Sequence, residues 1–293
     1  MKIKQPILFL CISVILSSCK TDKTKSDGKP AHLDKTPYEY VNTFIGTAPL
    51  LDEEIIGYTP PKDWRVWAGL TYPGSSLPNA MVQLSPITEY GTGAGYEYED
   101  TEILGFAHTN KGHWNLCNLP VLPISSQAKA PYKGTFSHDN ESASPDFYQV
   151  HLQNYDINVR LTSTLRAAIH EYQYGKADGK RILFDLGTAN NHVSHWEISK
   201  VSSNEISGFQ KVGKDKIHFF ARIDGAIDSI ASTNLGKPKG YAIVHLKDNS
   251  KEKVTMKMGL SYVNVDNAKL NLDKEVHKTL LLIIYTFVSI TLS

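Results

Sequence analysis

From residue 147 onward, apolar and polar residues alternate along the chain at the spacing of β-strands. Ile157, Val159 and Leu161 are separated by polar residues, which gives one apolar and one polar face. The same interpretation applies to segments 148–152, 167–174, 181–186, 193–201, 205–211, 216–223, 240–246 and 253–260. Clusters of Gly, Asn, Asp and Ser separate these segments, as is typical of turns. Many short strands without amphipathic helices between them predict an all-β fold, a large antiparallel β-sandwich.

The part of the chain before these strands is less regular. Prolines and glycines break residues 41–133 into short strands and loops. Long loops on a rigid sandwich are where binding residues tend to lie. We therefore search this stretch for functional residues, and expect the sandwich as a whole to span residues 38–268.

The N-terminus has the pattern of a lipoprotein signal peptide. Two lysines precede an apolar run over residues 6–16, which is too short to span a bilayer. Small residues then precede Cys19, as in a bacterial lipobox, so residues 1–19 are expected to be the signal and Cys19 the acylated mature N-terminus. The alternative is an ordinary cleaved signal with an incidental cysteine. Residues 20–37 are mostly Lys, Asp, Ser, Gly, Pro and Thr and predict a flexible tether.

This arrangement predicts a protein of the bacterial cell envelope, held to the membrane by a lipid anchor at the outer membrane or in the periplasm. Acyl chains contribute about 0.8 kcal/mol per buried methylene, so no spanning helix is needed.

The pattern changes twice near the C-terminus. Residues 268–277 intersperse charged and apolar positions as a helix does. Residues 280–292 then form a run of thirteen uncharged positions, too few to span a bilayer comfortably. We interpret residues 280–293 as an anomalous tail, the product of a shifted reading frame or a damaged gene end. A genuine C-terminal membrane association is the alternative.

Composition excludes several classes of function. The net charge is +1 with 21% charged residues, so there is no electrostatic case for a nucleic-acid partner. Of three cysteines, Cys11 lies in the signal and Cys19 is expected to be lipidated, which leaves Cys117 alone. This excludes a disulfide framework and a cysteine-based zinc site, and Cys117 is expected to be a small buried hydrophobe.

Four blocks in the first half of the chain stand out as a signature. They are segments 40–47 (YVNTFIGT), 71–86 (TYPGSSLPNAMVQLSP), 95–98 (GYEY) and 105–115 (GFAHTNKGHWN). In this order they resemble the N-terminal domain of glycoside hydrolase family 92, the bacterial calcium-dependent exo-α-mannosidases. The resemblance covers about residues 38–275 and is most specific in its first third.

The resemblance implies a fold and an activity. It implies a β-sandwich that forms one wall of a sugar pocket, hydrolysis of terminal α-mannosides in glycans such as N-glycans, and mannose-containing glycans as partners. It also implies a larger helical domain after this one. Segment 269–279 would then begin the helix or linker toward that domain, and the chain would be truncated before it.

No catalytic residue is assigned in this chain. Glycosidases need two carboxyl groups, about 6.5–9.5 Å apart in inverting enzymes. The family places this acid–base pair mainly in the helical domain or at its interface, and none of the acidic residues here falls in a motif that matches it. Calcium is implied for the full-length family enzyme, and no metal ligand is assignable here.

The candidate sugar-binding residues are aromatic or hydrogen-bonding side chains in the loops: His108, Asn110, His113, Trp114, Trp64 and Trp67. An imidazole can donate to or accept from hydroxyls, and an indole face suits the apolar face of a pyranose. Many family members carry His-Thr-His where this chain has Asn110. The alternatives are that His108 is a hydrogen-bonded loop residue, that Trp114 is a core side chain, and that Trp64 and Trp67 cover a small hydrophobic cluster.

Two further tyrosines are assigned to the core. Tyr96 and Tyr98 fall on the same face of an expected strand, so packing in the interior is the favoured interpretation.

We expect the chain to be the sugar-pocket or scaffold domain of an α-mannosidase-like glycoside hydrolase, inactive as this fragment. The alternative is a stand-alone carbohydrate-binding β-sandwich lipoprotein without catalytic activity. A β-sandwich adhesin would have neither mannose affinity nor a continuation of the gene. The DNA beyond the codon of Ser293 distinguishes these, because the first hypothesis predicts a continuing frame that encodes a helical domain.

The lipobox makes one prediction that a labelling experiment checks. Metabolic labelling with a palmitate analogue should mark the wild-type protein and leave Cys19→Ala unlabelled. Equal labelling of both proteins would contradict acylation at Cys19.

Overall fold

The computed structural model describes residues 36–62, 66–111, 114–175, 179–247 and 252–276. Its helices and strands belong to one compact unit that begins at Pro37. The expected signal peptide, nearly all of the tether and the uncharged tail fall outside the described residues. So do Cys19, Trp64 and His113.

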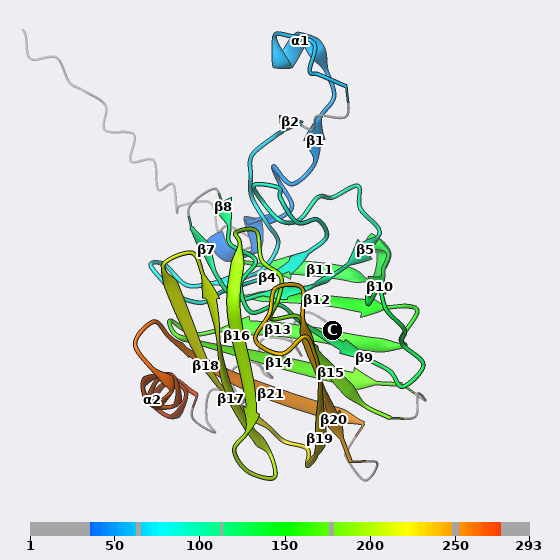
Figure 1. Ribbon diagram of the computed structural model, residues 1–293. Helices are drawn as coiled ribbons and strands as arrows, with labels where there is room; N and C mark the ends of the chain where they lie inside the picture. The colour runs from blue at the N-terminus through cyan, green and yellow to red at the C-terminus, as the bar shows by residue number, and fades with distance from the viewer. Residues whose placement is uncertain (1–35, 63–65, 112–113, 176–178, 248–251, 277–293) are drawn as a thin grey trace, which may run out of the picture. The chain divides into compact units, whose positions relative to one another are not determined.

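The larger sheet has eight strands (Figure 1). In spatial order they are β11 (Glu141–Ser144), β12 (Phe147–Leu152), β13 (Ile157–Ser163), β14 (Ala167–Tyr174), β21 (Lys253–Ser261), β18 (Asp215–Ile223), β17 (Glu205–Val212) and β16 (Val193–Lys200). Every neighbouring pair is antiparallel.

The second sheet has seven strands. Their order is β19 (Ile227–Thr233), β20 (Tyr241–Leu246), β15 (Arg181–Phe184), β9 (Val121–Ile124), β6 (Gly105–Ala107), β4 (Gln83–Ile87) and β3 (Ser75–Ser76). These pairs are antiparallel as well.

Three short ribbons and three short helices complete the loops. The ribbons pair β1 (Pro49–Leu50) with β2 (Val66–Trp67), β5 (Glu102–Ile103) with β10 (Gly134–Thr135), and β7 (Asn110–Lys111) with β8 (Trp114–Asn115). The helices are η1 (Pro37–Tyr40), α1 (Glu53–Ile56) and η2 (His138–Asn140). In Figure 1 the β1–β2 ribbon and α1 project beyond the sheets.

The core lies between the two sheets. Phe184 on β15 stacks on Phe219 of β18 with ring centroids 5.8 Å apart, and Phe106 on β6 packs against Tyr148 of β12 at 6.3 Å. All four rings are buried. Each of these contacts joins one sheet to the other, so the predicted antiparallel β-sandwich is confirmed.

The strand predictions after residue 147 hold to within two residues at most ends. In β13 the burial alternates as the sequence pattern requires, because Ile157, Val159 and Leu161 face the core. The pattern missed β11 and β19. Strand β19 is mostly exposed, and Ile227 is its one buried residue, so its sequence shows no alternation of apolar and polar positions.

The prediction of a strand that contains Tyr96 and Tyr98 is wrong. Gly95 has a φ of +72° and is the last residue of a turn, and residues 96–98 belong to no strand. A Cβ at Gly95 would lie 2.9 Å from the Asn115 side chain, so the turn needs glycine here. Tyr96 is nevertheless buried in the core as predicted, whereas Tyr98 is half-buried.

Two outer strands contain irregularities of register. The pairing of β16 shifts between Val193 and His195, and the pairing of β19 shifts between Ile227 and Ser229. Each shift indicates a β-bulge, which bends and twists the strand locally.

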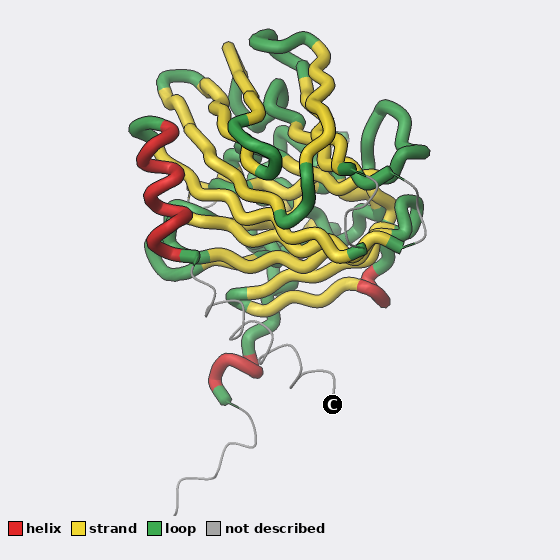
Figure 2. The backbone as a smooth tube through the Cα atoms, turned by 90° about the horizontal axis from the view of Figure 1, so that it is seen from below, coloured by secondary structure: helices red, strands yellow, loops and turns green. Residues whose placement is uncertain are grey.

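Helix α2 (Val265–Glu275) lies along the outer face of the larger sheet (Figure 2). The Asn264 side chain caps its N-terminus by accepting from Asn267 N at 2.8 Å. Ala268 and Leu272 are buried against the sheet. The helix predicted from residue 268 therefore begins earlier and packs on the sandwich. Within the described ranges, no helix is both long and apolar enough to cross a membrane.

A chain of buried hydrogen bonds links the two sheets. Nδ1 of His108, which follows β6, lies 2.7 Å from the carbonyl oxygen of Leu119. Its Nε2 lies 2.9 Å from Nε2 of His170 on β14, and His170 Nδ1 lies 3.0 Å from the Tyr172 hydroxyl. The side chains of His108, His170 and Tyr172 are fully buried. The structure thus places His108 in the interior and away from solvent, in a hydrogen-bonded role and not at an open sugar site.

The geometry fixes the tautomers of both histidines. The Leu119 carbonyl accepts, so His108 carries its hydrogen on Nδ1 and accepts on Nε2 from the Nε2–H of His170. His170 Nδ1 then accepts from Tyr172. Both rings are neutral in this arrangement. Burial lowers the pKa of His108 to about 3, and burial together with His108 lowers the pKa of His170 well below its usual value.

We expect Leu161→Ala to lower the free energy of unfolding by about 2–5 kcal/mol, because the change leaves a cavity between the sheets. Leu161 is 1% exposed, whereas Leu165 in the following turn is 45% exposed. Leu165→Ala is the matched control and should change stability by no more than about 0.5 kcal/mol. Chemical unfolding monitored by circular dichroism measures both. Equal losses would show that the alternation misplaces the core.

We expect the free energy of unfolding to fall as the pH is lowered from about 6.5 toward about 3. The pKa of each buried histidine is lower in the folded chain, so the unfolded chain takes up these protons first. The loss is at most about 1.4 kcal/mol per pH unit for each histidine. Urea unfolding between about pH 7 and pH 5 measures the slope.

The variant His170→Gln should have a shallower pH slope than the wild type, whatever its absolute stability. His151→Gln, which changes a partly exposed histidine on β12, is the control and should keep the wild-type slope. A His170→Gln slope as steep as that of the wild type would contradict the role of the buried pair.

Candidate functional site

Two of the candidate sugar contacts lie on the β7–β8 ribbon. Asn110 is opposite Asn115, and Lys111 is opposite Trp114. Trp114 is 36% exposed, so its indole is accessible to a ligand and is not a core side chain. The Oδ1 atom of Asn110 is buried and has no hydrogen-bond partner among the described residues.

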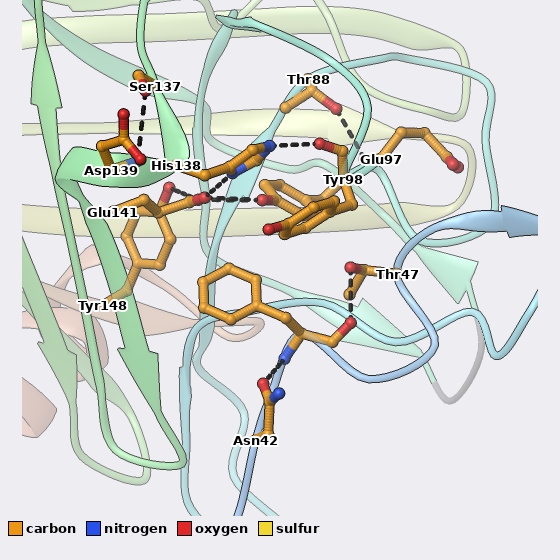
Figure 3. Close-up of polar contacts among 12 residues, drawn as sticks. Asn42, Thr47, Thr88, Glu97, Tyr98, Ser137, His138, Asp139, Glu141 and Tyr148 are labelled. Atoms are coloured by element: carbon orange, nitrogen blue, oxygen red, sulfur yellow. Dashed lines mark hydrogen bonds and ion pairs between the residues drawn. The ribbon is translucent and has the colours of Figure 1, made fainter.

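Trp67 has a contact inside the domain. It lies in β2 and is half-buried, and its indole N–H donates to the carboxylate of Glu97. Glu97 is fully buried, and its backbone N–H donates to Thr88 Oγ1 at 2.9 Å (Figure 3). Trp67 therefore ties the projecting ribbon to the body of the sandwich. The structure does not gather the described candidates into one pocket.

A pocket of about 350 Å³ lies beside η2, formed by parts of the chain that are distant in sequence. It is lined by Asn42, Phe44, Ile45, Ala48, Tyr98, His138 and Glu141, and we call it the aromatic pocket. Sequence analysis did not select any of these residues as ligand contacts. Asn42 and Phe44 lie within the YVNTFIGT block, and Tyr98 ends the GYEY block.

Local hydrogen bonds shape the loop that carries Asn42 and Phe44. The Phe44 N–H donates to Asn42 Oδ1 at 3.0 Å, and the Thr47 hydroxyl donates to the Phe44 carbonyl at 2.8 Å (Figure 3). Gly46 has a φ of +86°, and a Cβ there would lie 2.8 Å from Thr71 Oγ1. Glycine at this position therefore allows the loop to turn back against the chain.

Glu141 is the buried anchor of the aromatic pocket. Its side chain is 1% exposed, and its carboxylate accepts from three donors. The Tyr148 hydroxyl donates at 2.5 Å, the Tyr96 hydroxyl reaches both oxygens at 3.0 and 3.1 Å, and His138 Nδ1 lies at 2.6 Å. Charge-assisted bonds of this kind compensate a buried carboxylate for its lost water.

The two tyrosines act as permanent donors to this carboxylate. Burial first, and then the charge of Glu141, raises the pKa of Tyr96 and of Tyr148 well above the usual value. Both hydroxyls therefore stay protonated at physiological pH.

His138 joins the buried carboxylate to the wall of the aromatic pocket. Its Nδ1 faces Glu141 and its Nε2 lies 2.5 Å from the carbonyl oxygen of Tyr98 (Figure 3). Each ring nitrogen of His138 therefore has an oxygen acceptor within hydrogen-bond distance, and these contacts fix the plane of the ring. The Tyr98 ring stacks on His138 at 4.0 Å with an interplanar angle of 2°, and Phe44 meets Tyr98 edge to face at 6.0 Å.

Part of this site had a sequence signal. Ser137 caps η2 by accepting from Asp139 N, and His138 and Glu141 lie at the two ends of this single turn, three residues apart. The contacts to Tyr96 and Tyr98 lie about forty residues away in sequence, and no local pattern reveals them.

Among the described residues, no group of three or more His, Cys, Asp or Glu side chains is arranged to hold a metal ion. In the aromatic pocket, the oxygens of Glu141 already accept from protein donors and Asn42 Oδ1 accepts from Phe44 N. Calcium takes six to eight oxygen ligands, so this pocket does not fit it.

Comparison with solved structures shows which known proteins have a similar fold. The chain is similar to a family GH92 α-mannosidase from Bacteroides thetaiotaomicron, with a TM-score of 0.69 and 22% identity over 81% of this chain and 34% of that one. The same mannosidase in complex with mannoimidazole gives a TM-score of 0.68 with the same identity and coverage. An inverting GH92 mannosidase from the same organism gives 0.67 at 21% identity, over 83% of this chain and 34% of that one.

These similarities concern the fold, and this chain spans about a third of the length of the structures it matches. A comparison with curated proteins finds no match. The family model described as "Glycosyl hydrolase family 92 N-terminal domain" matches residues 40–261. That match includes both sheets and the aromatic pocket. The chain therefore belongs to glycosyl hydrolase family 92, through the N-terminal domain of that family.

Proposed function

We propose that this chain serves as a carbohydrate-binding and scaffold domain of an α-mannosidase-like glycoside hydrolase that acts on terminal α-mannosides of glycans. Family membership supports the class of activity. The related structures are named as mannosidases, and one of them was solved with mannoimidazole bound. Mannose-containing glycans are accordingly the partners we propose for this chain.

The observation that carries the proposal is the composition of the aromatic pocket. Its volume of about 350 Å³ is within the range of small-ligand sites. Phe44 and Tyr98 supply apolar ring surface for the C–H face of a sugar, and Asn42 offers an amide for its hydroxyls. The hydrogen bonds of His138 hold Tyr98 in place. Trp114 is an exposed indole and remains our candidate for a further sugar contact.

We also propose that this chain alone does not hydrolyse mannosides. Inverting hydrolysis needs two carboxyl groups about 6.5–9.5 Å apart, one as acid and one as base. Among the described residues that line the aromatic pocket, Glu141 alone carries a carboxyl group, and three protein donors occupy it. We infer that the acid–base pair belongs to a second domain, which the longer relatives have room to hold.

The N-terminal pattern adds a proposal about location. We infer that acylation at Cys19 anchors the domain at the bacterial cell envelope, with residues 20–37 as a tether. This placement suits a protein that meets extracellular or periplasmic glycans.

One experiment tests binding and turnover together. The full chain is titrated with methyl α-mannoside by calorimetry or NMR, and is then assayed on α-mannobiosides with added calcium. We expect saturable binding without turnover. Phe44→Ala and Asn42→Ala should each weaken binding by up to about tenfold, because a ring contact and a hydrogen bond each contribute about 0.5–1.5 kcal/mol.

Phe209→Ala is the matched control, because Phe209 lies on β17, toward the opposite end of the larger sheet from β11. It should leave mannoside binding unchanged. Absence of binding in the wild type, or equal weakening in Phe209→Ala, would overturn the sugar site. Turnover that disappears when a carboxylate within residues 36–276 is replaced would overturn the proposal that the chain alone is inactive.

A further inference from the structure

A second pocket lies at another part of the sandwich and shares no lining residue with the aromatic pocket. It has a volume of about 280 Å³ and lies between the loop that follows β9 and the turn between β12 and β13. The residues on which its chemistry depends are Ser125, Gln127, Lys129, Lys133, Asn154 and Tyr155. We call it the lysine pocket.

Hydrogen bonds hold the two walls of the lysine pocket together. The Asn154 side chain accepts from Thr135 N and donates to the Lys133 carbonyl, each at 2.9 Å. On the other wall, Arg181 Nη1 donates to the carbonyl of Ser126 at 3.2 Å. The lysine pocket is therefore a defined part of the fold and not a gap between loose loops.

The lysine pocket presents hydrogen-bond donors and positive charge. Lys129 and Lys133 contribute two ammonium groups, and none of the described residues that line it is acidic. Lys133 pairs with Glu102 at 2.7 Å, but both side chains are 40% exposed, and exposed pairs of this kind contribute little. Arg181 adds a third cation next to the loop.

Neutral donors complete the lining. Ser125 is 3% exposed and Tyr155 is 7% exposed, so these two hydroxyl-bearing residues of the lining are buried. Burial raises the pKa of Tyr155, which keeps its hydroxyl protonated and able to donate. Gln127 offers an amide N–H group. All of these groups can donate a hydrogen bond, and a small oxyanion is the class of ligand that accepts such bonds.

We propose that the lysine pocket binds the anionic group of a sugar derivative, a carboxylate or a phosphate, at a site separate from the aromatic pocket. Lys129 and Lys133 supply the charge, and Tyr155, Ser125 and Gln127 supply directed donors. The volume leaves room for about one sugar unit beside the anion. The domain would then hold a glycan at two points, one neutral and one charged.

Calorimetric titration of the full chain at low ionic strength tests this site. The probes are inorganic phosphate, glucuronate and neutral glucose, each used separately. We expect saturable binding of phosphate, glucuronate or both, no binding of glucose at this site, and weaker binding as salt is raised. Phosphate without glucuronate would identify a phosphate site, and the reverse a carboxylate site.

The paired variant Lys129→Gln with Lys133→Gln should weaken anion binding at least about tenfold, because two charge-assisted contacts are lost. Lys269→Gln is the matched control, since Lys269 is also an exposed lysine paired with a carboxylate, that of Asp273 on α2. It should bind anions as the wild type does. All proteins should unfold at the same midpoint.

Three results would overturn the proposal: no saturable anion binding, equal weakening in Lys269→Gln, or glucose binding as tight as glucuronate binding. Methyl α-mannoside binding at the aromatic pocket is measured on the same variants and should be unchanged. The proposal for the lysine pocket and the proposal for the aromatic pocket can therefore be refuted independently.

Discussion

The constraint on which the structure depends is that two sheets bury their inner faces against each other, so that each polar group caught between them needs a partner there. His108 and His170 meet this need as a neutral pair that joins β6 to β14. Gln210 on β17 meets it as well, accepting from Leu119 N and donating to the Leu186 carbonyl, each at 2.9 Å. These hydrogen bonds between the sheets specify the position of one sheet on the other. Apolar packing alone is less directional and fixes that position less strictly.

The strands of the larger sheet could be predicted from sequence because the alternation of apolar and polar residues lies within each strand. In β13 the side chains alternate between core and surface, and Ile157, Val159 and Leu161 record that alternation directly. The turn at Gly95 could not be predicted in this way, because it depends on contact with Asn115, twenty residues later. Strand β19 also escaped prediction, because Ile227 is its one buried residue and no alternation of apolar and polar positions marks it.

The candidate site was predictable only in outline. The sequence blocks include Asn42, Phe44 and Tyr98 of the aromatic pocket, but residue type alone does not tell whether a histidine faces solvent or the interior. His108 was expected at a sugar site and lies in the core, whereas Glu141 and Tyr148 received no functional role. The aromatic pocket exists because residues 42–48, 96–98 and 138–148 lie close together in space, and the sequence of any one of these segments does not indicate this contact.

The bulges in β16 and β19 have a consequence for how copies of this domain meet one another at high concentration. A regular outer strand offers a template on which a strand of another chain can add. Here the register shifts interrupt that template, and the exposed residues of β19 include Asp228, Ser232 and Thr233, which give an incoming strand little to pack against. These two outer strands therefore disfavour the addition of a strand from a second copy, and contact between copies at these edges is discouraged.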